Sequence, residues 1–204
     1  MAELEAGKQV PDLPLATAGR IVKPEDLRGS VFVVYFYPQD DTETCTVEAI
    51  SFSRLKAEFE AAGVAVFGVS PDSLAKHEKF SAKHKLTVDL ASDEDGKLVR
   101  AWGVWAEKKM FGRTYMGVVR TTFLVGRDGR IARVWKKVRV KGHAEEVLAA
   151  AKELSRAGKA LLTLTMCNPC CSFGMDSASR GTAPAVGSLR KASRTAHGHH
   201  RPRR

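Results

Sequence analysis

The stretch VFVVYFYPQDDTETC, residues 31–45, combines a strand, a turn and the start of a helix. Val31–Tyr37 is an unbroken run of β-branched and aromatic residues, which is typical of a strand buried on both faces of a sheet. Pro38 ends this strand, and the polar residues after it are typical of a turn. A helix is predicted over Cys45–Ala62, with apolar positions at Val47, Ile50, Phe52, Leu55, Phe59 and Ala62.

The rest of residues 1–155 alternates between strand-like and helix-like segments. Further strands are predicted at Leu15–Val22, Val64–Val69, Val88–Ala91, Thr121–Val125 and Ile131–Lys136. Further helices are predicted to follow Ser70-Pro71-Asp72, to lie near Trp102, and to cover Gly142–Ser155. Asp128-Gly129 indicates a hairpin turn. This order predicts an α/β fold with a central mixed sheet flanked by helices.

Positive charge is concentrated at the end of the 204-residue chain, whose formal net charge is +10. Residues 156–204 hold nine basic residues and one acidic residue, giving +8, and residues 1–155 hold 24 and 22, giving +2. The body is therefore not a strongly basic nucleic-acid-binding domain. We predict one domain over residues 1–155, followed by a low-complexity, basic tail that is mostly disordered. Nucleic acid is not expected as a partner, beyond weak, non-specific contact by the tail.

The sequence shows no secretory signal pattern and no run of roughly 20 apolar residues, so a cytoplasmic protein without a membrane partner is expected. Four cysteines in a chain of this length do not make a disulfide framework. Three of them lie in the tail, where the cysteines and histidines lack the spacing of a zinc site. No metal and no cofactor are expected.

Cys45 is the single cysteine of the body, and its place at the start of a helix has chemical consequences. Unpaired N–H groups and about half a positive charge at a helix N-terminus stabilise a thiolate. Thr42 lies three residues earlier, and Pro38 is placed to fix the loop and shield the sulfur. A cation is also needed to hold the thiolate. Arg120 is the candidate, because it directly precedes the predicted strand Thr121–Val125. The end of that strand should lie near the end of the strand Val31–Tyr37, which leads to Cys45.

The segment Pro38-Gln-Asp-Asp-Thr42-Glu-Thr-Cys45 resembles the Pro-x-x-x-Thr-x-x-Cys motif of the peroxiredoxins. The flanking segments resemble the bacterioferritin comigratory (Q-type) branch; they read Val-Tyr-Phe-Tyr-Pro, Cys-Thr-Val-Glu-Ala, Gly-Val-Ser-Pro-Asp, Trp-Gly-Val-Trp and Arg-Thr-Thr-Phe-Leu-Val. The resemblance covers about residues 5–155. It implies a thioredoxin-like fold and a thiol-dependent peroxidase that reduces hydrogen peroxide and organic hydroperoxides.

The resemblance also implies a role for each residue of the motif. Cys45 becomes the peroxidatic cysteine, which forms a sulfenic acid, and Thr42 becomes the hydroxyl that contacts the peroxide oxygen. Arg120 becomes the guanidinium partner, and Glu48, in Cys-x-x-Glu, supports the arginine or the geometry of the site. The alternative for Glu48 is an exposed carboxylate in the first turns of the helix, favoured by the helix dipole.

Two departures from the family bear on the catalytic cycle. The branch usually carries Thr-Pro-Gly-Cys, whereas Glu43 here brings a negative charge close to the thiolate. Ile50 stands where many members have a resolving cysteine, and the next helix, about Asp72–His84, contains none. We therefore predict that thioredoxin, glutaredoxin or a small thiol reduces Cys45. The alternative is a disulfide with a cysteine of the tail, which holds Cys167, Cys170 and Cys171.

Two functions of other kinds are weighed against the peroxidase. A redox-sensing or holdase protein would use oxidation of Cys45 as a signal rather than for turnover. A disulfide oxidoreductase is disfavoured, because the helix start has one cysteine rather than Cys-x-x-Cys. A monomer or weak dimer is expected, with His77 and His84 interpreted as surface residues.

Overall fold

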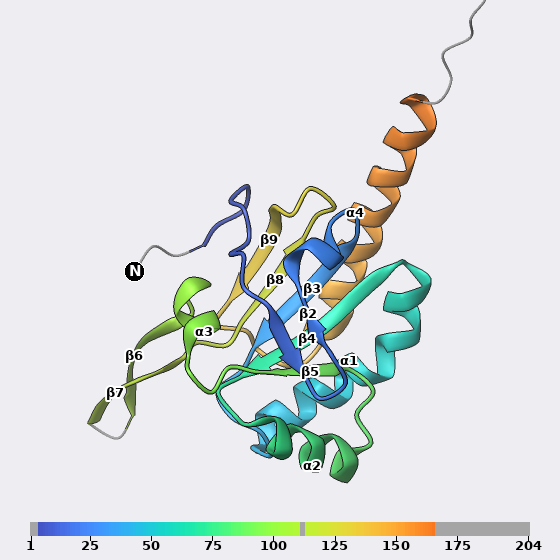
Figure 1. Ribbon diagram of the computed structural model, residues 1–204. Coiled ribbons are helices and arrows are strands. Elements are labelled where there is room, and N and C mark those ends of the chain that lie inside the picture. Colours follow the sequence, from blue (N-terminus) through green and yellow to red (C-terminus); the bar gives the residue numbers. More distant parts are fainter. Residues whose placement is uncertain (1–3, 111–112, 166–204) are drawn as a thin grey trace, which may run out of the picture. The chain divides into compact units, whose positions relative to one another are not determined.

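The computed structural model describes residues 4–110 and 113–165 (Figure 1). Within these residues, seven strands form one sheet in the order β2-β1-β5-β4-β3-β8-β9. They span Leu15–Thr17 (β1), Ile21–Val22 (β2), Val31–Phe36 (β3), Val64–Ser70 (β4), Asp89–Ser92 (β5), Thr121–Val125 (β8) and Ile131–Lys136 (β9). β4 runs parallel to both β3 and β5, and the other neighbours are antiparallel. The predicted mixed sheet is confirmed.

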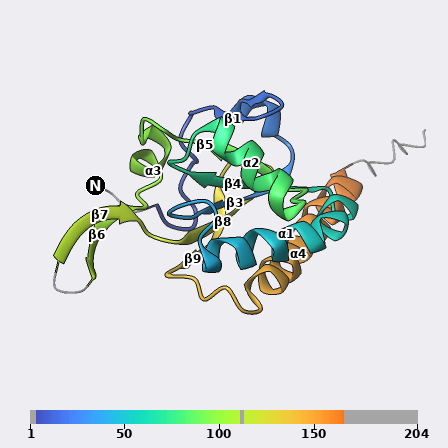
Figure 2. The ribbon, with the colours of Figure 1, turned by 90° about the horizontal axis from the view of Figure 1, so that it is seen from below.

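Helices cover both faces of this sheet (Figures 1 and 2). They are η1 (Pro24–Leu27), α1 (Glu43–Ala61), α2 (Leu74–His84), α3 (Lys97–Ala101) and α4 (His143–Thr165). α1, α2 and α4 share a core with Val33 and Tyr35 of β3. α3 packs on the opposite face, where it meets Val34 and Phe36. The flanking helices therefore form two layers around β3.

β3 is an interior strand of the sheet, between β4 and β8, and both of its faces are covered. All six of its residues are at most 3% exposed, which explains why Val31–Phe36 has no polar position. β3 pairs with β8 so that Phe36 lies opposite Thr121. Arg120 directly precedes β8, so this pairing brings it to the carboxyl end of β3, from which the chain continues to Cys45.

A second, two-stranded sheet is formed by β6 (Trp105–Met110) and β7 (Arg113–Val118). This hairpin projects from the main sheet in Figure 2. Sequence analysis did not predict it, because the charged run Glu107–Lys109 breaks the apolar alternation that indicates a strand.

Several predictions on burial were wrong. Val47 and Ile50, expected on the apolar face of α1, are 50% and 37% exposed. They point away from the sheet, and Ala49 and Phe52 occupy the buried face instead. His77, expected on the surface, is 1% exposed. Hydrophobic periodicity located the helix correctly, but the side that packs depends on the neighbours it meets.

α4 is longer than predicted. It continues to Thr165 rather than ending at Ser155, so residues 156–165 are helical and do not belong to a disordered tail. The extension includes Ala and Leu residues, which favour helix. The rest of the predicted tail, with Cys167, Cys170 and Cys171, lies outside the described residues.

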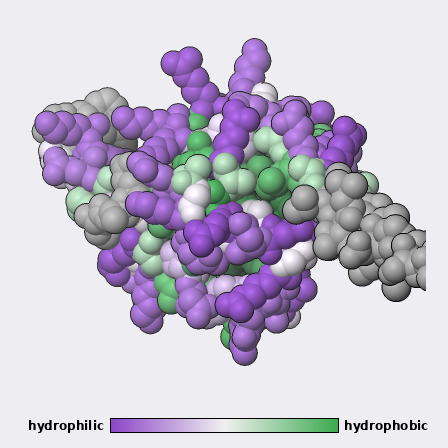
Figure 3. Space-filling model, turned by 90° about the horizontal axis from the view of Figure 1, so that it is seen from above, coloured by the Kyte–Doolittle hydropathy of each residue, from purple (hydrophilic) through white to green (hydrophobic). Residues whose placement is uncertain are grey.

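Hydrophilic side chains cover most of the face seen in Figure 3, with hydrophobic residues visible between them. No helix in residues 4–110 and 113–165 combines the length and the apolar character that a membrane crossing needs.

The start of α4 is fastened to β8 by a buried histidine, which makes the stability of the fold sensitive to acid. His143 Nε2 lies 2.8 Å from the Thr122 hydroxyl, and burial lowers the pKa of His143 from 6.5 to about 4. Between these values the unfolded chain binds a proton that the folded chain does not. The stabilising contribution is therefore complete above pH 6.5 and is lost as the pH falls towards 4.

We expect this loss to be on the order of 2 kcal/mol. Urea unfolding of the natural chain and of His143→Gln, at pH values on either side of 6.5, measures it. The glutamine amide still offers a partner to Thr122, but it does not titrate in this range. The variant should therefore show a weaker acid dependence. Equal acid dependence in the two proteins would contradict the assignment.

Candidate active site

Cys45 is the third residue of α1, after the N-cap residue Thr42. Its side chain is 2% exposed. The first N–H groups of a helix have no partner within the helix, and their partial positive charge stabilises an anion. The fold thus places the sulfur at the end of α1 that favours a thiolate.

The guanidinium of Arg120 links Cys45 to Glu48. Nη2 donates a hydrogen bond to the Cys45 sulfur at 3.1 Å, and Nη1 donates to Oε2 of Glu48. Its side chain is 13% exposed, so this contact is largely shielded from water. Burial alone would lower the pKa of Arg120, but the Glu48 carboxylate and the Cys45 sulfur raise it on balance. Cys45, Glu48 and Arg120 form what we call the thiol cluster.

Glu48 is buried, which excludes the alternative of an exposed carboxylate. It is 1% exposed, one turn after Cys45 on the same side of α1. Burial raises the pKa of Glu48 to about 7, although Arg120 opposes this rise. Oε1 has no hydrogen-bond donor among the described residues, so Arg120 holds this carboxylate through Oε2.

The loop between β3 and α1 is anchored to α2 by buried polar contacts. Asp40 Oδ2 lies 2.7 Å from Nδ1 of His77, and Oδ1 accepts a hydrogen bond from the Tyr37 hydroxyl at 2.7 Å. The second ring nitrogen of His77 lies 3.2 Å from the Ala91 carbonyl oxygen. Sequence analysis missed this network. The adjacent acids Asp40 and Asp41 gave no sign of which helix they would meet.

The two remaining predicted site residues lie near the cluster without bonding to it directly. Pro38 is exposed at the end of β3. The Thr42 hydroxyl donates to the Gln39 carbonyl oxygen at 3.3 Å and does not cap the helix. The structure therefore joins Cys45, Arg120 and Glu48 closely, and it places Pro38 and Thr42 in the loop beside them.

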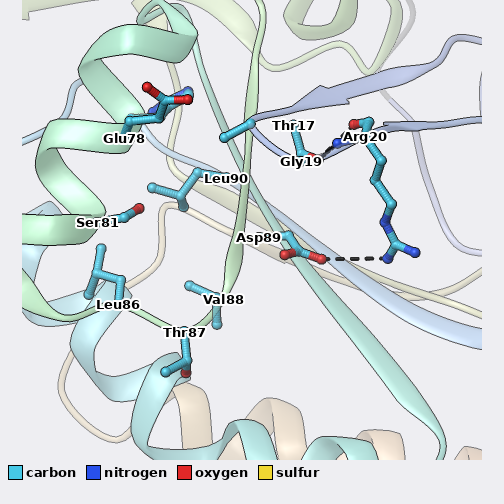
Figure 4. Close-up of a pocket in the computed structure, with 12 residues that line it drawn as sticks. Thr17, Gly19, Arg20, Glu78, Ser81, Leu86, Thr87, Val88, Asp89 and Leu90 are labelled. Atoms are coloured by element: carbon cyan, nitrogen blue, oxygen red, sulfur yellow. Dashed lines mark hydrogen bonds and ion pairs between the residues drawn. The ribbon is translucent and has the colours of Figure 1, made fainter. Parts of the chain in front are cut away.

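A separate groove lies between the turn after β1 and helix α2 (Figure 4). It has a volume of about 540 Å³, and Arg20 and Asp89 form an ion pair of 3.6 Å beside it. No residue of the thiol cluster lines it, and neither Pro38 nor Thr42 does. The groove is therefore separate from the thiol cluster.

The geometry agrees with comparisons to known proteins. Residues 6–134 match the model of the AhpC/TSA family. The chain belongs to the AhpC/TSA family. A curated relative of this AhpC/TSA chain, Peroxiredoxin Bcp of Bacillus subtilis, is 44% identical over 153 residues, which cover 74% of this chain and 98% of the relative.

Solved structures lead to the same conclusion. Peroxiredoxin Q of Xanthomonas campestris matches with a TM-score of 0.69 and 41% identity, covering 74% of this chain and 98% of that one. A structure of the bacterioferritin comigratory protein of that organism, concerned with its alkyl peroxide reduction, has a TM-score of 0.69 and 40% identity, covering 74% and 99%. This AhpC/TSA chain therefore has the thioredoxin-like fold of Q-type peroxiredoxins and is a thiol peroxidase. The resemblance drawn from Pro38–Cys45 is confirmed, and the redox-sensing or holdase alternative is not favoured.

Proposed function

We propose that Cys45 is the peroxidatic residue and that its substrates are hydrogen peroxide and organic hydroperoxides. The observation that carries this proposal is the bridge from Arg120 to both the Cys45 sulfur and Glu48. A guanidinium held in this way stabilises a thiolate before reaction and negative charge on oxygen during it. The alkyl peroxide reduction of the Xanthomonas campestris relative supports the organic substrates.

In the proposed reaction, the Cys45 thiolate attacks one oxygen of ROOH. An S–O bond forms while the O–O bond breaks, and the leaving oxygen takes a proton from solvent. The sulfur is oxidised to sulfenic acid and the peroxide is reduced to ROH. Arg120 and the free N–H groups of α1 stabilise the charge on the oxygens, and the Thr42 hydroxyl turns from Gln39 to contact the peroxide.

The proposed reductant of the sulfenic acid is an external thiol: thioredoxin, glutaredoxin or a small thiol. The course of α4 supports this, because α4 runs beside α1 away from Cys45. Lys152 pairs with Glu58, and the Ser155 hydroxyl donates to the Ala62 carbonyl, at the far end of α1 (Figure 1).

Helical rise gives the scale of this separation. From Cys45 to Ala62 it amounts to about 25 Å, and from Ser155 to Thr165 to about 15 Å more. The cysteines Cys167, Cys170 and Cys171 lie outside the described residues, so a disulfide between one of them and Cys45 stays the alternative to external reduction. A cytoplasmic location and a monomeric or weakly dimeric state remain predictions.

A variant with all three tail cysteines replaced by serine tests this proposal. We expect it to keep peroxide-dependent consumption of thioredoxin thiols, and one equivalent of peroxide followed by a sulfenic-acid trap should label Cys45. Mass spectrometry locates the label. Loss of turnover in this variant, or a Cys45 crosslink to a tail cysteine in the natural chain, would contradict external reduction.

A further inference from the structure

The β6–β7 hairpin directs one lysine toward the thiol cluster. Lys108 lies opposite Tyr115, and Gly117 follows Tyr115 on the same face of the hairpin. A Cβ atom at Gly117 would lie 3.2 Å from the Tyr115 ring and 3.6 Å from Cδ of Lys108. The Lys108 stem therefore crosses the space that glycine leaves free.

The ammonium group of Lys108 ends at the base of the hairpin. Its Nζ donates to the carbonyl oxygen of Val118, two residues before Arg120. Lys108 is half-buried, and burial and the charge of Arg120 lower its pKa while Cys45 opposes this. The hydrogen bond to Val118 holds the ammonium at the end of β7, two residues before Arg120, whose guanidinium contacts the Cys45 sulfur.

A second cation close to the thiol cluster would balance an excess of negative charge. Above the Glu48 pKa of about 7, where the thiolate and Glu48 are both ionised, two negative charges share the single positive charge of Arg120. Glu43, two residues before Cys45, adds another acidic side chain in the first turn of α1. Two further titratable side chains lie near the cluster, Tyr35 of β3 and His143 of α4. Burial raises the pKa of Tyr35 well above 10 and lowers that of His143 to about 4, so both are uncharged near neutral pH.

We propose that Lys108 is a positioning residue of the peroxidase, whose ammonium balances the remaining negative charge of the thiol cluster and so favours the Cys45 thiolate. The proposal rests on the proposed role of Cys45 as the reacting sulfur. It assigns a function to the hairpin, because Gly117 and the Val118 carbonyl hold the lysine in place. Lys108 acts through the sulfur and does not need to touch the peroxide.

The test is the pH dependence of Cys45 alkylation by iodoacetamide, in a background with the tail cysteines replaced by serine. Lys108→Met keeps the length of the stem and removes the charge. We expect the pH at which alkylation reaches half its plateau rate to rise by about one pH unit. Lys108→Arg should restore the natural midpoint. The matched control is Lys109→Met, since Lys109 is the next residue of β6, is exposed, and lies on the other face of the hairpin.

A midpoint for Lys108→Met equal to that of Lys109→Met would overturn the proposal. So would a rate that is lower at every pH with an unchanged midpoint, because that result indicates support of the hairpin alone. Alkylation needs neither peroxide nor reductant, so this result is independent of turnover. If Cys45 were not the peroxidatic residue, turnover would survive its replacement, whatever the alkylation midpoints show.

Discussion

Cys45→Ser is expected to lose peroxide-dependent thiol consumption, with turnover falling by at least about 1,000-fold. A serine hydroxyl does not ionise near neutral pH and cannot form the sulfenic acid through which the cycle passes. Serine is close to cysteine in size, and Arg120 remains held by Glu48. The loss therefore reports the missing sulfur rather than a collapsed site. The measurement is peroxide-dependent consumption of a thiol reductant, followed with and without the enzyme.

Two controls make this result decisive. Urea unfolding should give Cys45→Ser nearly the stability of the natural chain, because the substitution only exchanges the sulfur atom for a hydroxyl oxygen. The sulfenic-acid trap should label nothing in the variant after one equivalent of peroxide. Turnover that persists in Cys45→Ser and disappears when the tail cysteines are also replaced would assign the reaction to the tail.

Arg120→Met is expected to lower the second-order rate constant for peroxide by roughly 100- to 1,000-fold. The substitution removes the donor at 3.1 Å from the Cys45 sulfur and the partner of the buried Glu48 carboxylate. Arg120→Lys should recover only part of the rate, because one ammonium does not have the planar fork that bridges two acceptors. Stopped-flow detection of Cys45 oxidation measures the rate constant directly.

The loss of rate must be distinguished from a loss of protein stability, because Glu48 in Arg120→Met is buried without its cation. The double variant Arg120→Met with Glu48→Gln removes that unpaired carboxyl and should recover stability but not rate. A rate constant for Arg120→Met close to that of the natural chain would contradict the proposed role of Arg120. A rate restored by the double variant would mean that Arg120 acts only by neutralising Glu48.

Short-range features of the chain were predictable from the sequence. The buried strand Val31–Phe36 has a continuous apolar pattern, and Pro38 and the polar turn after it fix where α1 begins, within two residues. The strand ends also led to Arg120, and the structure places its guanidinium beside the sulfur. Each of these inferences depends on residues close together in sequence or on a simple rule of sheet geometry.

The wrong predictions of side-chain burial have a common cause. Val47 and Ile50 fit an apolar helical face yet are exposed, and His77 looked like a surface residue yet is buried against Asp40. In each case the outcome depends on which segment packs against the helix. That information is spread over residues distant in the chain, so the local pattern does not contain it.

The sequence alone determined that a single cysteine stands where a buried strand turns into a helix, because strand, turn and helix each have a local composition. Only the tertiary structure decided that Glu48 is buried and that Lys108 reaches the base of its hairpin. It also decided that α4 carries the chain away from Cys45. Burial and electrostatic interaction depend on distance in space, and the packing of the layers sets that distance.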